Sequence, residues 1–191
     1  MYQKRNNILE ILSLYRRNYN VRLYLREISK LSKIPLKTCQ NTLKDLENLK
    51  ILKSKKEGKN KYFYLNLENI KSKNYLLQAE IYQTNVFIEK YPRFKLFLKE
   101  LKNNPFILIF GSFAKFKANK NSDIDLLIIS KNQEIPFHLL PSKDHQIRLK
   151  EKGFIEAVNK QNELIKEIEE NHIILSNHSF YVNYMWDYYA K

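Results

Sequence analysis

Two short motifs contain the side chains whose types and spacing are best suited to chemistry. Gly111-Ser112 follows an apolar run at residues 106–110. After ten further residues, Asp123-Ile124-Asp125 leads into a second apolar run at residues 126–129. A glycine at the end of a strand lets the backbone approach a triphosphate closely, and the serine hydroxyl adds a donor. Two carboxylates spaced two apart on a strand share one face, where they suit Mg²⁺, so the spacing favours phosphoryl or nucleotidyl transfer.

The elements around these motifs must hold them in place. The two apolar runs predict buried strands, and Ile124 is expected to point into the core between the two carboxylates. Residues 112–117 are expected to begin a short helix whose N-terminus faces the phosphates. Residues 154–170 predict one amphipathic helix that packs on the core. The aromatic tail at 180–189 fits either a helix docked on the core or a surface that stacks on bases.

This segment resembles the signature of the polymerase-beta superfamily of nucleotidyltransferases. That signature is an apolar strand, Gly-Ser, a short helix with Ala-x-Gly-x-Ala, then Ser-Asp-x-Asp and a second apolar strand. The residues that match it are Gly111, Ser112, Ala114, Ala118, Ser122, Asp123 and Asp125. The resemblance implies that Gly111, Ser112, Lys115 and Ser122 bind the nucleotide. It also implies that Asp123 and Asp125 are the catalytic residues and the ligands of Mg²⁺ or Mn²⁺.

The chain departs from this family pattern at two places. Phe116 stands where the family has its second glycine, and its large side chain is expected to narrow the phosphate loop or cap the site. The family also has a third carboxylate on a later strand, which here is expected at residues 145–149. If Ile147 and Leu149 are buried, Gln146 and Arg148 face the site, and neither replaces a carboxylate. Asp144 and Glu151 flank this strand, while the histidines, His145 among them, are expected in surface or core roles.

The first 67 residues resemble a winged helix-turn-helix. Helical periodicity predicts helices at 4–17, 24–31 and 37–49, and a hairpin follows with strands at 51–56 and 62–67. Residues 37–49 would be the recognition helix and the hairpin would be the wing. The candidate DNA-binding residues are Lys37, Thr38, Gln40, Asn41, Lys44, Lys55, Lys56, Lys59 and Lys61.

The charge distribution favours a polyanion partner for this N-terminal part. The chain has a net charge of +14, and residues 1–67 contain 16 Lys and Arg against 5 Asp and Glu. Such a concentrated basic excess suits double-stranded DNA. Two other interpretations stay open, namely a generally lysine-rich composition and a winged helix that serves for dimerisation.

The predicted fold class is α+β, with three domains or segments. Residues 1–70 would form the winged helix-turn-helix, and residues 71–104 a helical connector that packs on the second domain or on a second copy of the chain. Residues 105–191 would form a small nucleotidyltransferase domain with a mixed sheet flanked by helices. Cys39 is the single cysteine, which excludes an internal disulfide and fits the cytoplasm. No apolar run reaches the length of a membrane span, so no membrane partner is expected.

These observations leave three hypotheses of function. The first is an enzyme that transfers a nucleoside monophosphate from an NTP to a hydroxyl or phosphate acceptor, which includes the case of a partner protein as acceptor. The second is a DNA-binding transcriptional regulator whose nucleotidyltransferase domain is degenerate and weakly active or inactive. The third is one half of a complex, either a homodimer or a pair with another protein, with the winged helix and the aromatic tail as interfaces.

Overall fold

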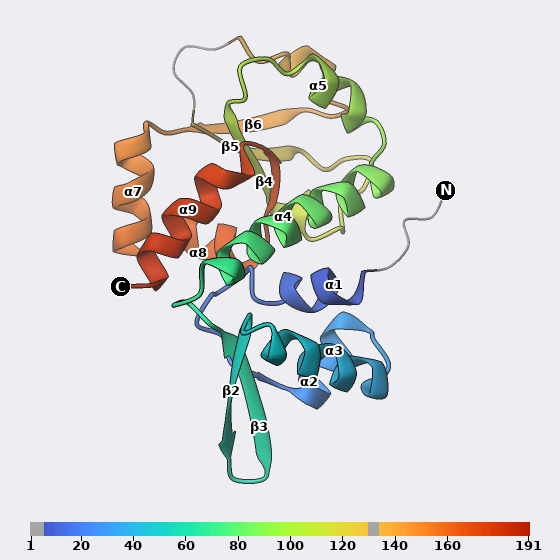
Figure 1. Cartoon of the computed structure of the whole chain (residues 1–191). Coiled ribbons are helices and arrows are strands. Elements are labelled where there is room, and N and C mark those ends of the chain that lie inside the picture. Colours follow the sequence, from blue (N-terminus) through green and yellow to red (C-terminus); the bar gives the residue numbers. More distant parts are fainter. Residues whose placement is uncertain (1–5, 130–133) are drawn as a thin grey trace. The chain divides into compact units, whose positions relative to one another are not determined.

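The computed structural model describes residues 6–129 and 134–191 (Figure 1). It divides into two compact units, one of Met1–Ala79 with Tyr189–Lys191 and one of Glu80–Tyr188. The boundary lies inside α4 (Ile70–Lys90), within the segment predicted as a connector, and the division at residues 70 and 104 stays a prediction. Helices together with two sheets confirm the α+β class. Among the described residues, no helix combines the length and the apolar character that crossing a membrane requires.

The first unit contains the predicted three helices and a hairpin. The helices are α1 (Asn7–Ser13), α2 (Leu25–Ser32) and α3 (Leu36–Asn48), and the hairpin strands are β2 (Leu52–Glu57) and β3 (Asn60–Leu65). A short strand that the sequence did not predict, β1 (Leu23–Tyr24), adds to the hairpin in the antiparallel order β1-β3-β2. The first helix was predicted at residues 4–17. Residues 4 and 5 lie outside the described part of the chain, and the helix ends at Ser13, four residues earlier than predicted.

Local signals explain where these helices begin. The side chain of Asn6 accepts hydrogen bonds from the backbone N–H groups of Ile8 and Leu9, which caps α1. Pro35 stands at the N-cap of α3, where its missing N–H costs nothing. Isoleucine and leucine side chains from all three helices then fill the core of this unit: Ile11, Leu12, Ile28, Leu43 and Leu46.

The second unit is built on a four-stranded mixed sheet, as predicted. Its strands are β4 (Phe106–Phe110), β5 (Ile124–Ile129), β6 (Asp144–Arg148) and β7 (Ile173–Ser176), in the order β6-β5-β4-β7. β5 runs parallel to β6, and the other two pairs are antiparallel. The strand β5 begins at Ile124, two residues before the predicted run, because Ile124 already pairs with Asp144.

Both faces of this sheet are covered. On one face, alternate residues of β4 and β5 pack against α5 (Phe94–Glu100) and the end of α4, in a cluster that includes Phe87, Phe94, Ile107, Ile109, Leu126 and Ile128. On the other face, Phe106 contacts Phe154 of α7 (Glu151–Lys160) and Tyr181 of α9 (His178–Tyr189). The aromatic tail is therefore largely a core element, since Tyr181, Met185 and Trp186 are all buried.

The single helix predicted at residues 154–170 is wrong. The chain forms two helices there, α7 and α8 (Glu163–Glu170). Gln161 takes the left-handed conformation, with φ +48, and Asn162 then accepts a hydrogen bond from the N–H of Ile165, which starts a new helix. The sequence holds a signal of this break, because no apolar residue stands between Val158 and Leu164 and Asn162 is a favourable helix N-cap.

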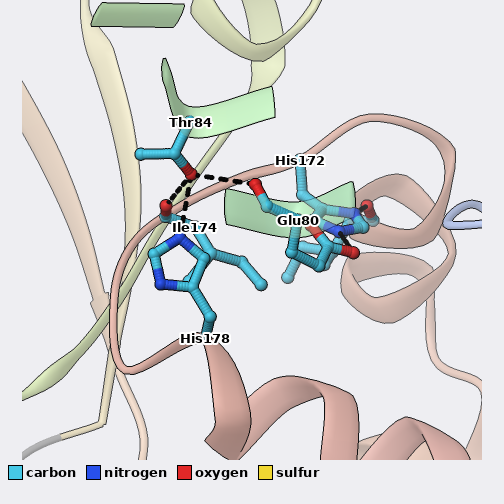
Figure 2. Close-up of polar contacts among 6 residues, drawn as sticks. Glu80, Thr84, His172, Ile174 and His178 are labelled. Atoms are coloured by element: carbon cyan, nitrogen blue, oxygen red, sulfur yellow. Dashed lines mark hydrogen bonds and ion pairs between the residues drawn. The ribbon is translucent and has the colours of Figure 1, made fainter. Parts of the chain in front are cut away.

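A buried polar network connects α4 with β7 and α9 (Figure 2). Thr84 donates its hydroxyl proton to the carbonyl of Ile174 at 2.6 Å, and its oxygen lies 2.9 Å from Nε2 of His178. One hydroxyl proton serves one acceptor, so His178 must donate to Thr84. Beside it, His172 donates from Nδ1 to a backbone carbonyl, and its Nε2 lies 3.1 Å from Oε1 of Glu80. A proton between His172 Nε2 and Glu80 Oε1 gives each of these two atoms a hydrogen-bond partner. The partner matters because both side chains are buried away from water.

We expect Thr84→Val to lower the free energy of unfolding by about 1–3 kcal/mol. Valine has nearly the shape of threonine, but it leaves the Ile174 carbonyl and the His178 ring without the hydroxyl between them. Urea unfolding followed by the fluorescence of the buried Trp186 measures the change in this unit. The control is Thr84→Ser, which keeps the hydroxyl, and equal losses in the two variants would contradict the role of the hydrogen bonds.

Candidate functional site

The register of β4 and β5 brings the two sequence motifs together. Phe110, the last residue of β4, pairs with Asp125, so the backbone of Gly111 lies beside the Asp125 side chain. Gly111 has φ +68, and a Cβ placed on it would lie 2.3 Å from Oδ2 of Asp125. A side chain at this position would displace the Asp125 carboxylate. Glycine is therefore favoured twice, by its backbone conformation and by the carboxylate over it.

The two aspartates lie at the start of β5, as the spacing predicts. Ile124 between them is fully buried, and this confirms the expected alternation. Asp123 is exposed and Asp125 is half-buried. Burial raises the pKa of the Asp125 carboxyl above its ordinary value, and this effect is opposed by His145 and reinforced by the negative charges of Glu167 and Asp123. A divalent cation would relieve the repulsion among these carboxylates.

The other candidate nucleotide-binding residues lie around Gly111 and in the loop that follows. Ser112 is half-buried in α6 (Gly111–Ala114), a single turn of helix. Lys115 comes directly after it, with its Nζ 3.9 Å from Oε1 of Glu167. Ser122 closes a turn with Asn119, because its hydroxyl accepts from the Asn119 N–H and its own N–H donates to the Asn119 carbonyl. This turn positions the chain just before Asp123.

Phe116 does not cap the site. Its ring packs at the end of α4, stacked on Tyr91 and edge-on to Phe87, in the cluster that covers the opposite face of the sheet from Asp125. Lys90 donates a hydrogen bond to the Phe116 carbonyl. The backbone of Phe116 nevertheless has φ +56, the conformation that a glycine at this place adopts easily. The aromatic packing of its ring offsets the strain of this left-handed backbone.

The expectation that Gln146 and Arg148 face the site is wrong. Asp125 pairs with His145 in the parallel register of β5 and β6, so His145 shares the face of Asp125. Its Nδ1 lies 3.8 Å from Oδ1 of Asp125. Gln146 and Arg148 lie on the other face, hydrogen-bonded to each other, and the Arg148 guanidinium lies over Phe137.

Sequence reasoning therefore missed two residues near the carboxylates, His145 on β6 and Glu167 on α8. His145 was missed because both faces of the sheet carry apolar side chains, so the apolar, half-buried Ile147 did not reveal which face carries the site. Glu167 was missed because it lies on the polar face of α8, in a segment that the sequence pattern assigned to core packing. The other flanking acid, Glu151, contacts Tyr184, while Asp144 accepts from Gln146 on the opposite face.

The donor set fits a divalent cation that arrives with a nucleotide. Within residues 6–129 and 134–191, no group of three or more His, Cys, Asp and Glu side chains is placed to hold a metal ion. Asp123 and Asp125 would supply two carboxylates, and the Asp125 carboxylate lies beside the backbone of Gly111. Mg²⁺ is commonly bound in this way, by one or two carboxylates together with substrate phosphates and water.

In the first unit, six candidate DNA-binding residues lie together. They line a groove of about 1040 Å³ between α3 and the β2–β3 hairpin. The α3 members are exposed and spaced as one helical stripe. The six residues are Lys37, Gln40, Asn41, Lys44, Lys59 and Lys61.

The remaining three candidates do not line this groove. Thr38 is half-buried on α3, and its carbonyl accepts from the hydroxyl of Thr42. Lys55 pairs with Tyr62 across the hairpin and forms an ion pair with Glu57. Lys56 is exposed opposite Lys61.

We expect substitutions of two glycines in the second unit to act in opposite directions. Gly111→Ala should lower the free energy of unfolding by about 1–2 kcal/mol from the backbone alone, and by more because Asp125 must move. Gly153→Ala, in the first turn of α7 with open space around it, should raise it by up to about 0.5–1 kcal/mol. Urea unfolding followed by Trp186 fluorescence compares them, and a neutral Gly111→Ala would argue against the close approach.

Comparison with known proteins agrees with this geometry. Residues 94–180 match the model of the family described as Polymerase beta, Nucleotidyltransferase. The matched segment runs from α5 to the start of α9 and includes all four strands of the mixed sheet. Comparisons with curated proteins and with solved structures found no match. The family match supports a nucleotidyltransferase domain of the polymerase-beta superfamily at residues 94–180.

Proposed function

We propose that this protein transfers a nucleoside monophosphate from an NTP to a hydroxyl or phosphate acceptor, with Mg²⁺ or Mn²⁺ bound at Asp123 and Asp125. The observation that carries the proposal is the Asp125 carboxylate held directly over the backbone of Gly111. In this proposal, the contact would set a metal-binding oxygen beside Gly111-Ser112, the segment that would bind the triphosphate. The family match of residues 94–180 supports the same chemistry.

Each residue near the carboxylates has a part in this proposal. Ser112 and the backbone of Gly111 would donate to phosphate oxygens. Lys115, whose ammonium lies near Glu167, is exposed enough to turn toward the triphosphate and neutralise its charge. When a divalent cation is bound, it supplies charge stabilisation for the phosphoryl group. The half-buried carboxylate of Asp125 holds its charge in a less polar setting than Asp123, which strengthens its interaction with any cation.

We expect Asp123→Asn and Asp125→Asn each to lower transfer from labelled ATP or another NTP by roughly a hundredfold or more. Loss of a metal ligand removes several kcal/mol of transition-state stabilisation, and each 1.4 kcal/mol corresponds to about tenfold. The measurement is incorporation of label into candidate acceptors, which include nucleic acids, the chain itself and co-expressed proteins, with Mg²⁺ or Mn²⁺ present.

The matched control is Asp187→Asn, which removes an exposed carboxylate of α9 in the same unit. It should transfer at the wild-type rate. Transfer that persists in both site variants at the wild-type level would overturn the assignment of the site. Absence of transfer in the wild-type protein with every NTP and acceptor would favour a domain that has lost turnover.

A second candidate function, duplex DNA binding by the first unit, is favoured by the groove between α3 and the hairpin. Cations stand on both of its sides, Lys37 and Lys44 on the helix and Lys59 and Lys61 on the hairpin. Gln40 and Asn41, between the helix cations, are side chains that read base edges. Together with the three helices and hairpin, this arrangement is the one expected of a winged helix-turn-helix.

Glu47 holds the hairpin against α3, since it accepts hydrogen bonds from Ser54 and Lys61. The hairpin strand is thus fixed at a set distance from the helix, which suits a wing that contacts phosphates while the helix enters the major groove. If the protein binds DNA without any transfer activity, it acts as a DNA-binding regulator with a degenerate nucleotidyltransferase domain.

We expect the double variant Lys37→Glu, Lys44→Glu to weaken binding to duplex DNA by more than tenfold at 100 mM salt. It should also reduce the slope of log K against log salt by about two, because each phosphate contact contributes about one. Fluorescence anisotropy with a labelled duplex at several salt concentrations measures both quantities.

The control variant is Lys30→Glu, Lys71→Glu, which makes the same charge change in the first unit at exposed lysines outside the groove. It should leave the salt slope nearly unchanged. If both double variants weaken binding equally, the attraction is a general effect of positive charge and the groove is not the DNA site.

A further inference from the structure

A pocket of about 620 Å³ lies in the second unit, apart from the candidate metal-binding residues. Three segments line it, namely residues 90–94 where α4 gives way to α5, Phe113 together with residues 118–120, and Pro141-Ser142 before β6. None of the candidate metal-binding or nucleotide-binding residues is among them. Small-molecule sites in proteins have volumes of roughly 300–1,000 Å³, so this pocket has the size for a ligand such as a nucleotide.

The charged side chains that line this pocket are all basic. They are Lys90, Arg93 and Lys120, and no carboxylate of the described chain lines the pocket with them. All three are exposed, and no described carboxylate forms an ion pair with any of them. Lys90 donates one hydrogen bond to the Phe116 carbonyl, which leaves its ammonium two further protons to donate. A pocket lined by charges of one sign attracts the opposite charge, so the ligand expected here is an anion.

The rest of the pocket wall favours a ligand that also carries a planar ring. Most of it consists of aromatic rings, prolines and an alanine: Tyr91, Pro92, Phe94, Phe113, Ala118 and Pro141. A flat ring packs on such side chains, while guanidinium and ammonium groups donate charge-assisted hydrogen bonds to phosphate oxygens. The side chains of Asn119 and Ser142 add polar groups for the edge of a base or a sugar hydroxyl. A nucleoside phosphate combines all of these features.

We propose that this pocket is a second nucleotide-binding site, which holds a nucleoside phosphate separately from the NTP at Gly111-Ser112. The ligand is a free nucleotide or a nucleotide unit of a nucleic-acid strand, because both present the same ring and phosphate. The inference goes beyond the proposed function, since binding here requires neither a metal ion nor transfer. Asn119 belongs to the turn just before Asp123, so the occupant lies next to the segment that leads into the carboxylates.

The test is fluorescence anisotropy of two probes, ATP labelled on the ribose and a short labelled single-stranded DNA with a terminal phosphate. Both are measured in EDTA, which removes the divalent cations that the proposed transfer site needs. The full-length protein carries Lys37→Glu and Lys44→Glu, so that the groove of the first unit contributes little. Adding Arg93→Glu and Lys120→Glu should weaken binding at least about tenfold, because it reverses charges that would contact phosphate. The probe that binds more tightly identifies the source of the nucleotide.

The matched control adds Lys95→Glu and Lys99→Glu instead, which makes the same charge change at exposed lysines of α5 outside the pocket. It should leave binding nearly unchanged, and unlabelled tripolyphosphate, which has no ring, should compete much less well than ATP. The inference is overturned if neither probe binds in EDTA, if both sets of variants weaken binding equally, or if tripolyphosphate competes as well as ATP. Asp125→Asn should bind both probes normally in EDTA, so a loss of transfer in that variant concerns the proposed function alone.

Discussion

The contact between the Asp125 carboxylate and the backbone of Gly111 constrains how the strands of the second unit must pair. It exists because Phe110 pairs with Asp125 at the end of the β4–β5 ladder. A slip of one residue would send Asp125 to the opposite face of the sheet and bring Ile124 in its place. Such a slip would move the Asp125 carboxylate into the apolar cluster that covers the opposite face, and the cost of burying it there opposes the slip. The hydrophobic core therefore sets the position of the carboxylate as well as the stability of the fold.

Features with a local cause could be predicted from the sequence. The strands around Gly111 and Asp125, the burial of Ile124 and the helical stripe on α3 follow from short-range periodicity and spacing. The place of His145 could not be predicted, because it depends on the pairing of β6 with β5, and a sheet buried on both faces gives no alternation that distinguishes them. The break at Asn162 has a local signal that the prediction overlooked, since five polar residues separate Val158 from Leu164 and asparagine is a common N-cap.

The hairpin of the first unit shows the same division between local and tertiary information. Its lysines are equally basic in sequence, yet strand alternation directs Lys61 toward Glu47 of α3 and Lys55 toward the face of Tyr62. Arg22 lies near the rings of Tyr62 and Tyr64 on that second face and pairs with Glu57. One face of the hairpin therefore completes the groove, and the other face makes contacts within the unit. A count of charges in the sequence does not show this difference.

The left-handed backbone of Phe116 has a thermodynamic consequence for ligand binding. A glycine there would give the loop between Gly111 and Asp123 many accessible conformations, which a ligand would have to restrict at the expense of its own affinity. The ring packed on Tyr91, and the hydrogen bond from Lys90, restrict that loop already during folding. The loop therefore loses its conformational entropy during folding and not when a ligand binds. A larger part of the ligand's interaction energy then contributes to its affinity.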